Sequence, residues 1–383
     1  MKQGEIKQIL SRNLRNLKGW QTRRKVIVFE SDDWGSIRMP DKYTFNKLLE
    51  KGVRVDDCPY NRYDSLASED DLTELFETLL KFRDINNNHP IITANCLIAN
   101  PDFDKIRSNG FCEYYYEIFT DSLKRYPNHS NSFKLWEAGM KERLFHPQFH
   151  GREHLHVKRW MKGLRQNLPE TRLAFDHKLF GISTSISSEG RKSYLAAYDI
   201  DDLDDEIIIK EIIKDGLMHF RKIFGYASKS FIAPNYYLPQ RIEKTLFENG
   251  IKYIQGQRIQ LSPEFESDKV KKISRYIGHI NINRQIYTVR NCHFEPSLFP
   301  KKNSVGECLA QIGTAFRWNK PAIISSHRVN FIGTLDESNR KNNLTKFKEL
   351  LYAIQSKWPD AEFMTSDELG DTITNSLILN NEQ

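Results

Sequence analysis

The sequence contains no long apolar run. No stretch approaches the roughly 18 to 20 apolar residues that a helix needs to span a bilayer. The first 20 residues are charged throughout and have no apolar segment of the kind that a secretory signal peptide carries. We therefore expect no membrane span and a cytoplasmic location.

Cysteine is scarce, and its spacing shows no metal-binding or redox motif. The chain of 383 residues has five cysteines, an odd number, and no two are separated by two residues. This favours free thiols in a reducing compartment. Low-complexity linkers and internal repeats are also lacking. We expect an amphipathic helix in residues 1–22 and a single barrel domain over 23–383, with rim insertions near 175–205 and 257–300.

The formal net charge of +7 is spread along the chain. No nucleic-acid-binding motif accompanies it, so we expect no nucleic-acid partner. A polyanionic or phosphorylated substrate fits the charge equally well.

Apolar segments with strand and helix character alternate along almost the whole length. Helical patterns cover residues 72–82 and 206–224, and short β-branched runs precede turn residues. The runs that we expect to be strands are residues 25–29, 91–97, 144–146, 229–233, 251–254 and 321–326. This alternation predicts an α/β fold with a mainly parallel sheet, and at this length a closed or nearly closed barrel.

Acidic and imidazole side chains follow several of these expected strands. Asp32 and Asp33 follow the first strand, His146 ends a later one, and His150 comes four residues after it. His327 follows the strand at 321–326. Because reactive side chains of parallel α/β barrels lie at the C-terminal ends of strands, these residues are expected to converge on one rim. The alternative interpretations are an Asp-rich turn and ordinary core or surface histidines.

Two imidazoles and one carboxylate form a ligand set that suits a catalytic Zn²⁺ or a related divalent metal. A water molecule on that metal would be the nucleophile, the second carboxylate its base, and a histidine on the opposite side the acid. His150 and His154 have the same spacing as His146 and His150. Pro147 favours His146, because a proline there places His146 at a strand end and not within a helix.

These short motifs resemble the polysaccharide deacetylase family of carbohydrate esterases. The family motif Thr-Phe-Asp-Asp-Gly is similar to residues 30–35, Glu-Ser-Asp-Asp-Trp-Gly, with Trp34 inserted. The motif His-Ser/Thr-x-x-His is matched by residues 146–150, and Leu-x-His loosely by residues 325–327. In the motif Arg-x-Pro-Tyr, Ile232 stands in the place of the arginine, and Asn235 precedes Tyr236.

The resemblance implies a distorted (β/α)7-type barrel and metal-dependent hydrolysis of an acetyl group on a sugar or polysaccharide precursor. It implies that Asp33, His146 and His150 hold the metal, expected to be Zn²⁺, that Asp32 is the base and that His327 is the acid. Backbone amides near residues 234–236 would stabilise the oxyanion. In the family, the motif arginine contacts the catalytic carboxylate, and Arg152 or Arg328 are the candidates to replace it here.

Three residues are candidates for contact with the sugar: Trp34, Asn235 and Tyr236. Aromatic rings stack on the apolar faces of sugars, although aromatic side chains at strand ends more often pack in the core or rim.

Three other functions compete with deacetylation. A glycoside hydrolase on a similar barrel would need two carboxylates that flank one bond, which adjacent residues do poorly. Iron oxygenases also use two histidines and a carboxylate, but on an all-β fold. A catalytically inactive carbohydrate-binding barrel is the third alternative, and the missing arginine favours it.

Overall fold

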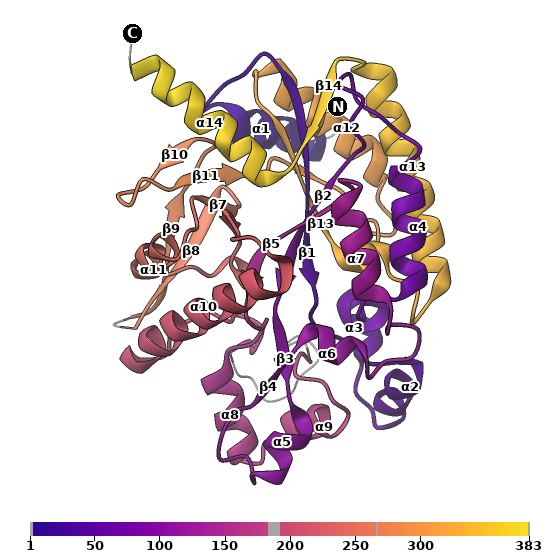
Figure 1. Cartoon of the computed structure of the whole chain (residues 1–383), viewed down its shortest axis with the longest axis vertical. Helices are drawn as coiled ribbons and strands as arrows, with labels where there is room; N and C mark the ends of the chain where they lie inside the picture. The colour runs from indigo at the N-terminus through magenta and orange to yellow at the C-terminus, as the bar shows by residue number, and fades with distance from the viewer. Residues whose placement is uncertain (1–2, 183–191, 266, 382–383) are drawn as a thin grey trace.

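A curled, mainly parallel sheet forms the centre of the molecule in the computed structural model, which describes residues 3–182, 192–265 and 267–381 (Figure 1). Its strand order is β10-β11-β7-β6-β5-β2-β1-β13-β12, and β14 also pairs with β1. All of these pairings are parallel except β10 with β11. The strands are β1 (Lys25–Trp34), β2 (Ile92–Leu97), β5 (Phe145–Gly151), β6 (Ser230–Phe231), β7 (Tyr253–Gly256), β10 (His279–Ile280), β11 (Ile286–Val289), β12 (Cys292–His293), β13 (Ala322–His327) and β14 (Ala361–Met364).

The sheet lies at the core of the chain because its strands are apolar on both faces. Val26, Ile27 and Val28 of β1 are completely buried, as is Phe145 of β5. Strands of this composition need cover on both faces, which helices supply in α/β folds. The longer helices are α4 (Glu69–Leu79), α7 (Ser132–Lys141), α10 (Leu203–Phe224), α12 (Ser304–Arg317), α13 (Glu337–Lys357) and α14 (Ser366–Asn381). The expected α/β fold with a distorted (β/α)7-type barrel of mainly parallel strands is thus confirmed.

Within the described residues, no strand pairing joins the two edges of the sheet, β10 and β12. The N-terminal helix α1 (Gln3–Asn16) and the residues after it lie across this gap. Trp20 donates its backbone N–H to the carbonyl of Ile277, which lies just before β10, at 2.8 Å. Asn291, just before β12, donates to Asn16 Oδ1 at 2.8 Å. The start of the chain therefore bridges the open seam of the barrel.

Shorter elements extend the barrel at its rim. They are α2 (Lys42–Glu50), α3 (Pro59–Tyr63), β3 (Ala99–Pro101), α5 (Phe103–Ser108), β4 (Tyr116–Ile118), α6 (Phe119–Leu123), α8 (Val157–Arg165), α9 (Pro169–Asp176), α11 (Glu243–Glu248) and the hairpin of β8 (Ile259–Glu264) and β9 (Ser267–Ser274). Figure 1 shows α5, α8 and α9 grouped beyond β3 and β4, at the opposite end of the molecule from the chain termini.

The two segments that were expected to be rim insertions differ in content. The segment near 175–205 includes residues 183–191, which lie outside the described residues. The segment near 257–300 contains the β8–β9 hairpin and three strands of the main sheet. None of the described helices combines the length and the apolar content needed to cross a membrane.

Strand β5 extends further than the sequence predicts. A strand was expected to end at His146, but β5 continues through Pro147 to Gly151. The proline is tolerated because β6, the neighbour on one side, pairs with β5 only through Phe231 and Phe149. No ladder hydrogen bond from residue 147 to that side is therefore lost.

Candidate metal and acid–base site

A β-bulge brings both carboxylates of the Asp32–Asp33 pair to one cavity. Ser31 is opposite Ala94 of β2 and Trp34 is opposite Cys96, so that Asp32 and Asp33 together face one residue, Asn95. Adjacent strand residues normally point to opposite faces, and a bulge breaks that alternation. Asp33 has φ of 75°, a left-handed conformation that is uncommon outside glycine and occurs at functional sites. Both carboxylates line a cavity of about 760 Å³.

A second bulge lies on β5, which is separated from β1 by β2 in the sheet. On β5, Phe149 is opposite Cys96 and Gly151 is opposite Leu97, which leaves His150 as the extra residue. Gly151 has φ of 140°, and a Cβ atom there would lie 2.9 Å from the hydroxyl of Tyr198. Glycine is therefore required at the residue that turns the chain away after His150.

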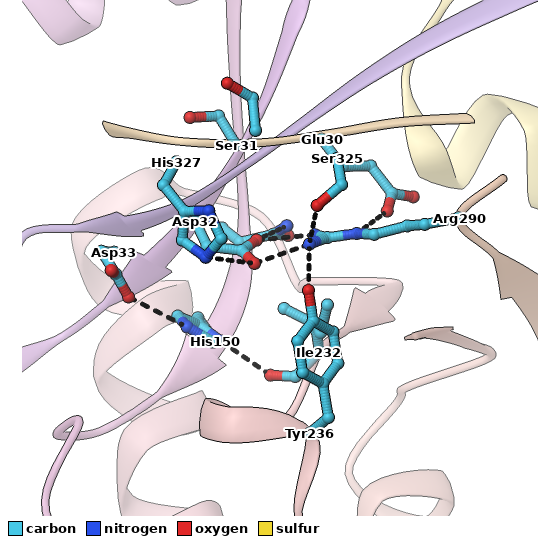
Figure 2. Close-up of polar contacts among 12 residues, drawn as sticks. Glu30, Ser31, Asp32, Asp33, His150, Ile232, Tyr236, Arg290, Ser325 and His327 are labelled. Atoms are coloured by element: carbon cyan, nitrogen blue, oxygen red, sulfur yellow. Dashed lines mark hydrogen bonds and ion pairs between the residues drawn. The ribbon is translucent and has the colours of Figure 1, made fainter. Parts of the chain in front are cut away.

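Asp33, His150 and His154 form a group that is suited to a metal ion. Asp33 Oδ1 lies 3.5 Å from His150 Nε2 and 3.4 Å from His154 Nε2. One ligand atom of each residue lies within 4.8 Å of those of the other two, and all three side chains are buried. His150 Nδ1 lies 2.9 Å from the carbonyl oxygen of Ile232, which can only accept a hydrogen bond (Figure 2). Nδ1 therefore carries a proton, the arrangement found in histidines that bind a metal through Nε2.

The electrostatics of the group agree with this assignment. Burial lowers the pKa of His154 to about 3, against the opposing effect of Asp33, so its imidazole is neutral near pH 7. Burial acts to raise the pKa of Asp33, but Arg38, His150 and His154 outweigh it and hold that pKa well below its usual range. Two imidazoles and one carboxylate with ligand atoms close together are a donor set that Zn²⁺ prefers. The residues therefore fit a divalent metal.

His146 does not belong to this group. It lies four positions before His150, which corresponds to about 13 Å along an extended chain. Its ring is stacked on Tyr226 with centroids 5.3 Å apart, and its Nε2 is 3.3 Å from Asp367. The structure therefore groups Asp33 and His150 with His154, and not with His146 as the sequence analysis expected. The reason is that β5 ends at Gly151 and not at His146, so the rim is reached only at His150.

Asp32 is held by an arginine from a distant part of the chain. Arg290, directly after β11, contacts Asp32 Oδ2 through Nη1 at 2.7 Å and Oδ1 through Nη2 at 2.6 Å (Figure 2). Asn95 also donates to Asp32 Oδ1, at 2.7 Å. Burial acts to raise the pKa of Asp32, but Arg290 overcomes it and lowers the pKa to about 2. Asp32 is therefore ionised near neutral pH and can accept a proton.

Arg290 has further partners that fix its position. Its Nε donates to Glu30 Oε2 at 2.6 Å, and its Nη1 lies 3.1 Å from the hydroxyl of Tyr236 and 3.2 Å from Ser325 Oγ. Arg290 is completely buried, as is Glu30. The two arginines proposed from the sequence have other partners: Arg152 pairs with Glu153 and Asp215, and Arg328 pairs with Asp64. Neither replaces the motif arginine, and Arg290 contacts Asp32 instead.

His327, at the end of β13, is the protonated partner of Asp32. Its Nδ1 donates to Glu295 Oε1 at 2.6 Å, and its Nε2 lies 3.8 Å from Asp32 Oδ2. Burial alone would lower the pKa of His327, but Glu295, Asp32 and Asp33 raise it to about 10. His327 is therefore charged at neutral pH and can donate a proton. Tyr60 covers its ring edge to face, with centroids 5.4 Å apart.

The expected substrate-binding residues divide into two groups. Asn235 and Tyr236 line the cavity, and both have positive φ, 53° and 60°. Trp34 does not line it. Its side chain is 1% exposed and packs on Phe145 and Trp136, with centroids 4.8 and 6.1 Å away. The bulge at Asp32 and Asp33 explains the difference, because it turns the next residue of β1 into the core.

Two functional candidates, Arg290 and Glu295, were not identified from the sequence, and His154 was only an alternative to His146. His154 had a usable signal, since it repeats the spacing of His146 and His150. Arg290 directly follows β11, but no sequence pattern near it indicates a contact with Asp32. Glu295 has no sequence signal that we can identify.

Comparison with family models gave no match, and comparison with curated protein sequences gave none. Several solved structures have a similar fold. A candidate polysaccharide deacetylase from Mycobacterium smegmatis is 11% identical, with 94% of this chain and 93% of that chain covered and a TM-score of 0.46. A probable polysaccharide deacetylase from Pseudomonas aeruginosa PAO1 is 8% identical, with 91% of each chain covered and a TM-score of 0.45. A 4-alpha-glucanotransferase from Thermococcus litoralis is 12% identical, with 90% of this chain and 40% of that chain covered and a TM-score of 0.45.

Polysaccharide deacetylases are thus among the solved structures that this chain is similar to. The identities of these three structures do not exceed 12% and their TM-scores are below 0.5. The function is therefore inferred from the residues of the site.

Proposed function

We propose that the protein is a metal-dependent hydrolase that removes an acetyl group from an acetylated sugar or polysaccharide precursor. Asp33, His150 and His154 would hold the metal, for which their nitrogen-rich set favours Zn²⁺. When bound, such an ion is a Lewis acid that polarises a carbonyl and makes a water molecule acidic. The substrate class, an acetylated carbohydrate, is inferred from the resemblance of the sequence motifs to those of polysaccharide deacetylases.

One observation carries the proposal: Asp32 Oδ2 and His327 Nε2 lie 3.8 Å apart, and both residues line the cavity that Asp33, His150 and His154 also line. Hydrolysis of an amide needs a base that takes a proton from water and an acid that gives one to the leaving nitrogen. The pKa of about 2 leaves Asp32 free to accept, and the pKa of about 10 leaves His327 with a proton to give.

Arg290 and Glu295 keep these two states in place. Arg290 fixes both oxygens of Asp32, so that the carboxylate has one orientation toward the cavity. Glu295 accepts from His327 Nδ1 and directs Nε2 toward Asp32. The missing arginine at Ile232 favoured an inactive barrel, and Arg290 removes that reason because it supplies the same charge to the same carboxylate.

The test is acetate release from acetylated amino sugars by the purified protein. We expect release that a chelator abolishes and added Zn²⁺ restores, and that Asp33→Asn and His154→Ala abolish. His146→Ala is the matched control, because it removes an imidazole from the same strand outside the group. Release of reducing ends without acetate would overturn the proposal in favour of a glycosidase. Sugar binding without either product would identify a binding protein.

A further inference from the structure

A second cavity adjoins the first at the open seam of the barrel, and its lining is basic. It has a volume of about 250 Å³, and we call it the basic recess; its lining includes Arg12, Arg15, His293, Lys302 and Ser304. His293, Glu295 and Phe299 line both this recess and the larger cavity that contains Asp32 and His327. An occupant of the recess would therefore lie next to the proposed acid–base pair.

The positive charge in the recess is not neutralised. Arg15 donates from Nη1 to His293 Nε2 at 2.9 Å, so its partner is an imidazole and not a carboxylate. Lys302 lies over the ring of Phe299, with Nζ 4.1 Å from the centroid. Burial lowers the pKa of Arg15, and the like charges of Arg258 and Arg12 lower it further. Cations that gather in this way around one recess are typical of an anion site.

His293 is kept neutral by the same field. Burial, Arg15, Arg290 and His327 lower the pKa of His293 to about 4. Because arginine can only donate, His293 Nε2 accepts from Arg15, and the imidazole holds the guanidinium in place without cancelling its charge.

Two carboxylates line the recess as well. Glu295 is committed to His327 at 2.6 Å and accepts from Asn330 at 2.8 Å. The lining then has one further carboxylate, Glu307, for three cations, Arg12, Arg15 and Lys302, so the recess keeps an excess of positive charge. A lone carboxylate ligand would balance less of this charge than a phosphate group, which carries up to two charges and three acceptor oxygens.

The first turn of α12 adds a second type of donor. The helix begins at Ser304, whose side chain lines the recess. Ser304 is 8% exposed, and its Oγ is buried without a hydrogen-bond partner among the described residues. The N–H groups of Ser304, Gly306 and Glu307 are already bonded to Lys302 and Asn303, so the hydroxyl of Ser304 is the donor that this turn offers to an anion.

We propose that the basic recess binds a phosphate or diphosphate group that the sugar substrate carries, with Arg12, Arg15, Lys302 and Ser304 as its ligands. This inference rests on the proposed function, since it names the class of acetylated sugar that the site takes: a sugar phosphate or a nucleoside diphosphate sugar. The N-terminal helix would then be part of the substrate site as well as the bridge across the open seam.

The first experiment measures binding alone, with inorganic pyrophosphate as the probe in titration calorimetry. We expect wild-type protein to bind it and Arg12→Gln/Arg15→Gln to bind about tenfold or more weakly, because hydrogen bonds to charged groups are lost. Arg12→Gln/Lys302→Gln should show the same loss and leaves the contact of Arg15 with His293 intact. Lys18→Gln/Arg23→Gln is the charge-matched control on the same segment and should not change the affinity.

Absence of pyrophosphate binding, equal binding by all variants, or equally tight binding of glucuronate would overturn the recess as a phosphate site. The second experiment compares acetate release from N-acetylglucosamine, its 1-phosphate and its uridine diphosphate derivative. We expect Arg12→Gln/Arg15→Gln to raise KM for the phosphorylated forms about tenfold or more, with kcat and the unphosphorylated sugar unaffected. A larger effect on the 1-phosphate identifies a phosphate monoester as the bound group, and a larger effect on the uridine diphosphate derivative identifies a diphosphate.

The two proposals fail in different ways. If the deacetylase function is wrong, no sugar releases acetate, but pyrophosphate binding and its loss in the variants persist. If the recess is wrong, acetate is released equally well from sugars with and without phosphate.

Discussion

Arg290 joins Asp32 to Glu30 from the far end of the sequence. Its two terminal nitrogens contact the two oxygens of Asp32 at 2.7 and 2.6 Å, and its Nε contacts Glu30 Oε2 at 2.6 Å. One buried cation is thus shared by two buried carboxylates. Burial raises the pKa of Glu30, against the opposing effect of Arg290.

Loss of this cation is expected to destabilise the fold. Arg290→Met would leave Glu30 buried without its counter-charge and Asp32 with only His327 as a nearby cation, and breaking a buried ion pair costs about 3–5 kcal/mol. Urea unfolding measures this loss. Adding Glu30→Gln to Arg290→Met should restore part of the stability, because one uncompensated charge is removed. A stability of Arg290→Met equal to that of the wild type would contradict a structural role for the pair.

The three metal ligands should be separable from the neighbouring histidine. His150→Ala and His154→Ala each remove one donor, and the loss of affinity should exceed the 10- to 100-fold cost of changing a residue behind a ligand. His146→Ala should bind metal as the wild type does. Metal content after dialysis against a weak chelator is the measurement. Metal loss in His146→Ala with retention in His154→Ala would reverse the ligand assignment.

Stability should fall in alkaline solution because of His327. Its pKa in the folded protein is raised to about 10 by Glu295 and the two aspartates, despite burial, from the ordinary value of 6.5. A group with a raised pKa contributes stability that is complete below pH 6.5 and is lost as the pH rises through 10. We expect the melting temperature of wild-type protein to fall over this range and that of His327→Gln to fall less. Parallel curves for the two proteins would argue against the protonated state of His327.

Trp34 should matter for folding and not for sugar binding. Trp34→Ala removes a buried ring packed on Phe145 and Trp136, and such a change costs about 3–5 kcal/mol. Trp34→Phe keeps a ring but loses the hydrogen bond from Nε1 to Ser31 Oγ, at a cost of about 1 kcal/mol. Chemical denaturation gives both values. A weaker affinity of the folded Trp34→Phe variant for sugar would place the side chain in contact with substrate.

The sequence predicts the parts of the site that depend on strand ends. The apolar run before Asp32 identifies β1, and the run before His327 identifies β13, so both residues are expected at the rim and both line the cavity. The choice between His146 and His154 depends on where one strand ends. Pro147 suggests wrongly that the strand ends at His146. A proline, which has no N–H group, is tolerated within a strand where the neighbouring strand has no hydrogen bond to receive at that position.

Other features depend on contacts that no local pattern encodes. Arg290 and Asp32 are 258 positions apart in the sequence, and Arg290 reaches Asp32 only because β11 and β1 curl around the same cavity. The bulges that expose Asp33 and His150 are offsets in pairing between strands, which the pattern of a single strand does not contain. Trp34 was expected to contact the substrate because the bulge before it, which turns its side chain into the core, cannot be read from the sequence.

The positions of the site residues in the chain separate two chemical tasks. The group suited to a metal ion lies wholly within the first 154 residues: Asp33 and His150 are on β1 and β5, which flank β2, and His154 lies just after β5. The groups that set the proton chemistry, Arg290, Glu295 and His327, belong to the last third of the chain. Asp32 is the only member of the acid–base pair that adjoins a metal ligand in sequence. Under the proposed function, variation in the last third would change proton transfer and leave the residues suited to a metal intact, so affinity for metal and dependence on pH would be separately adjustable.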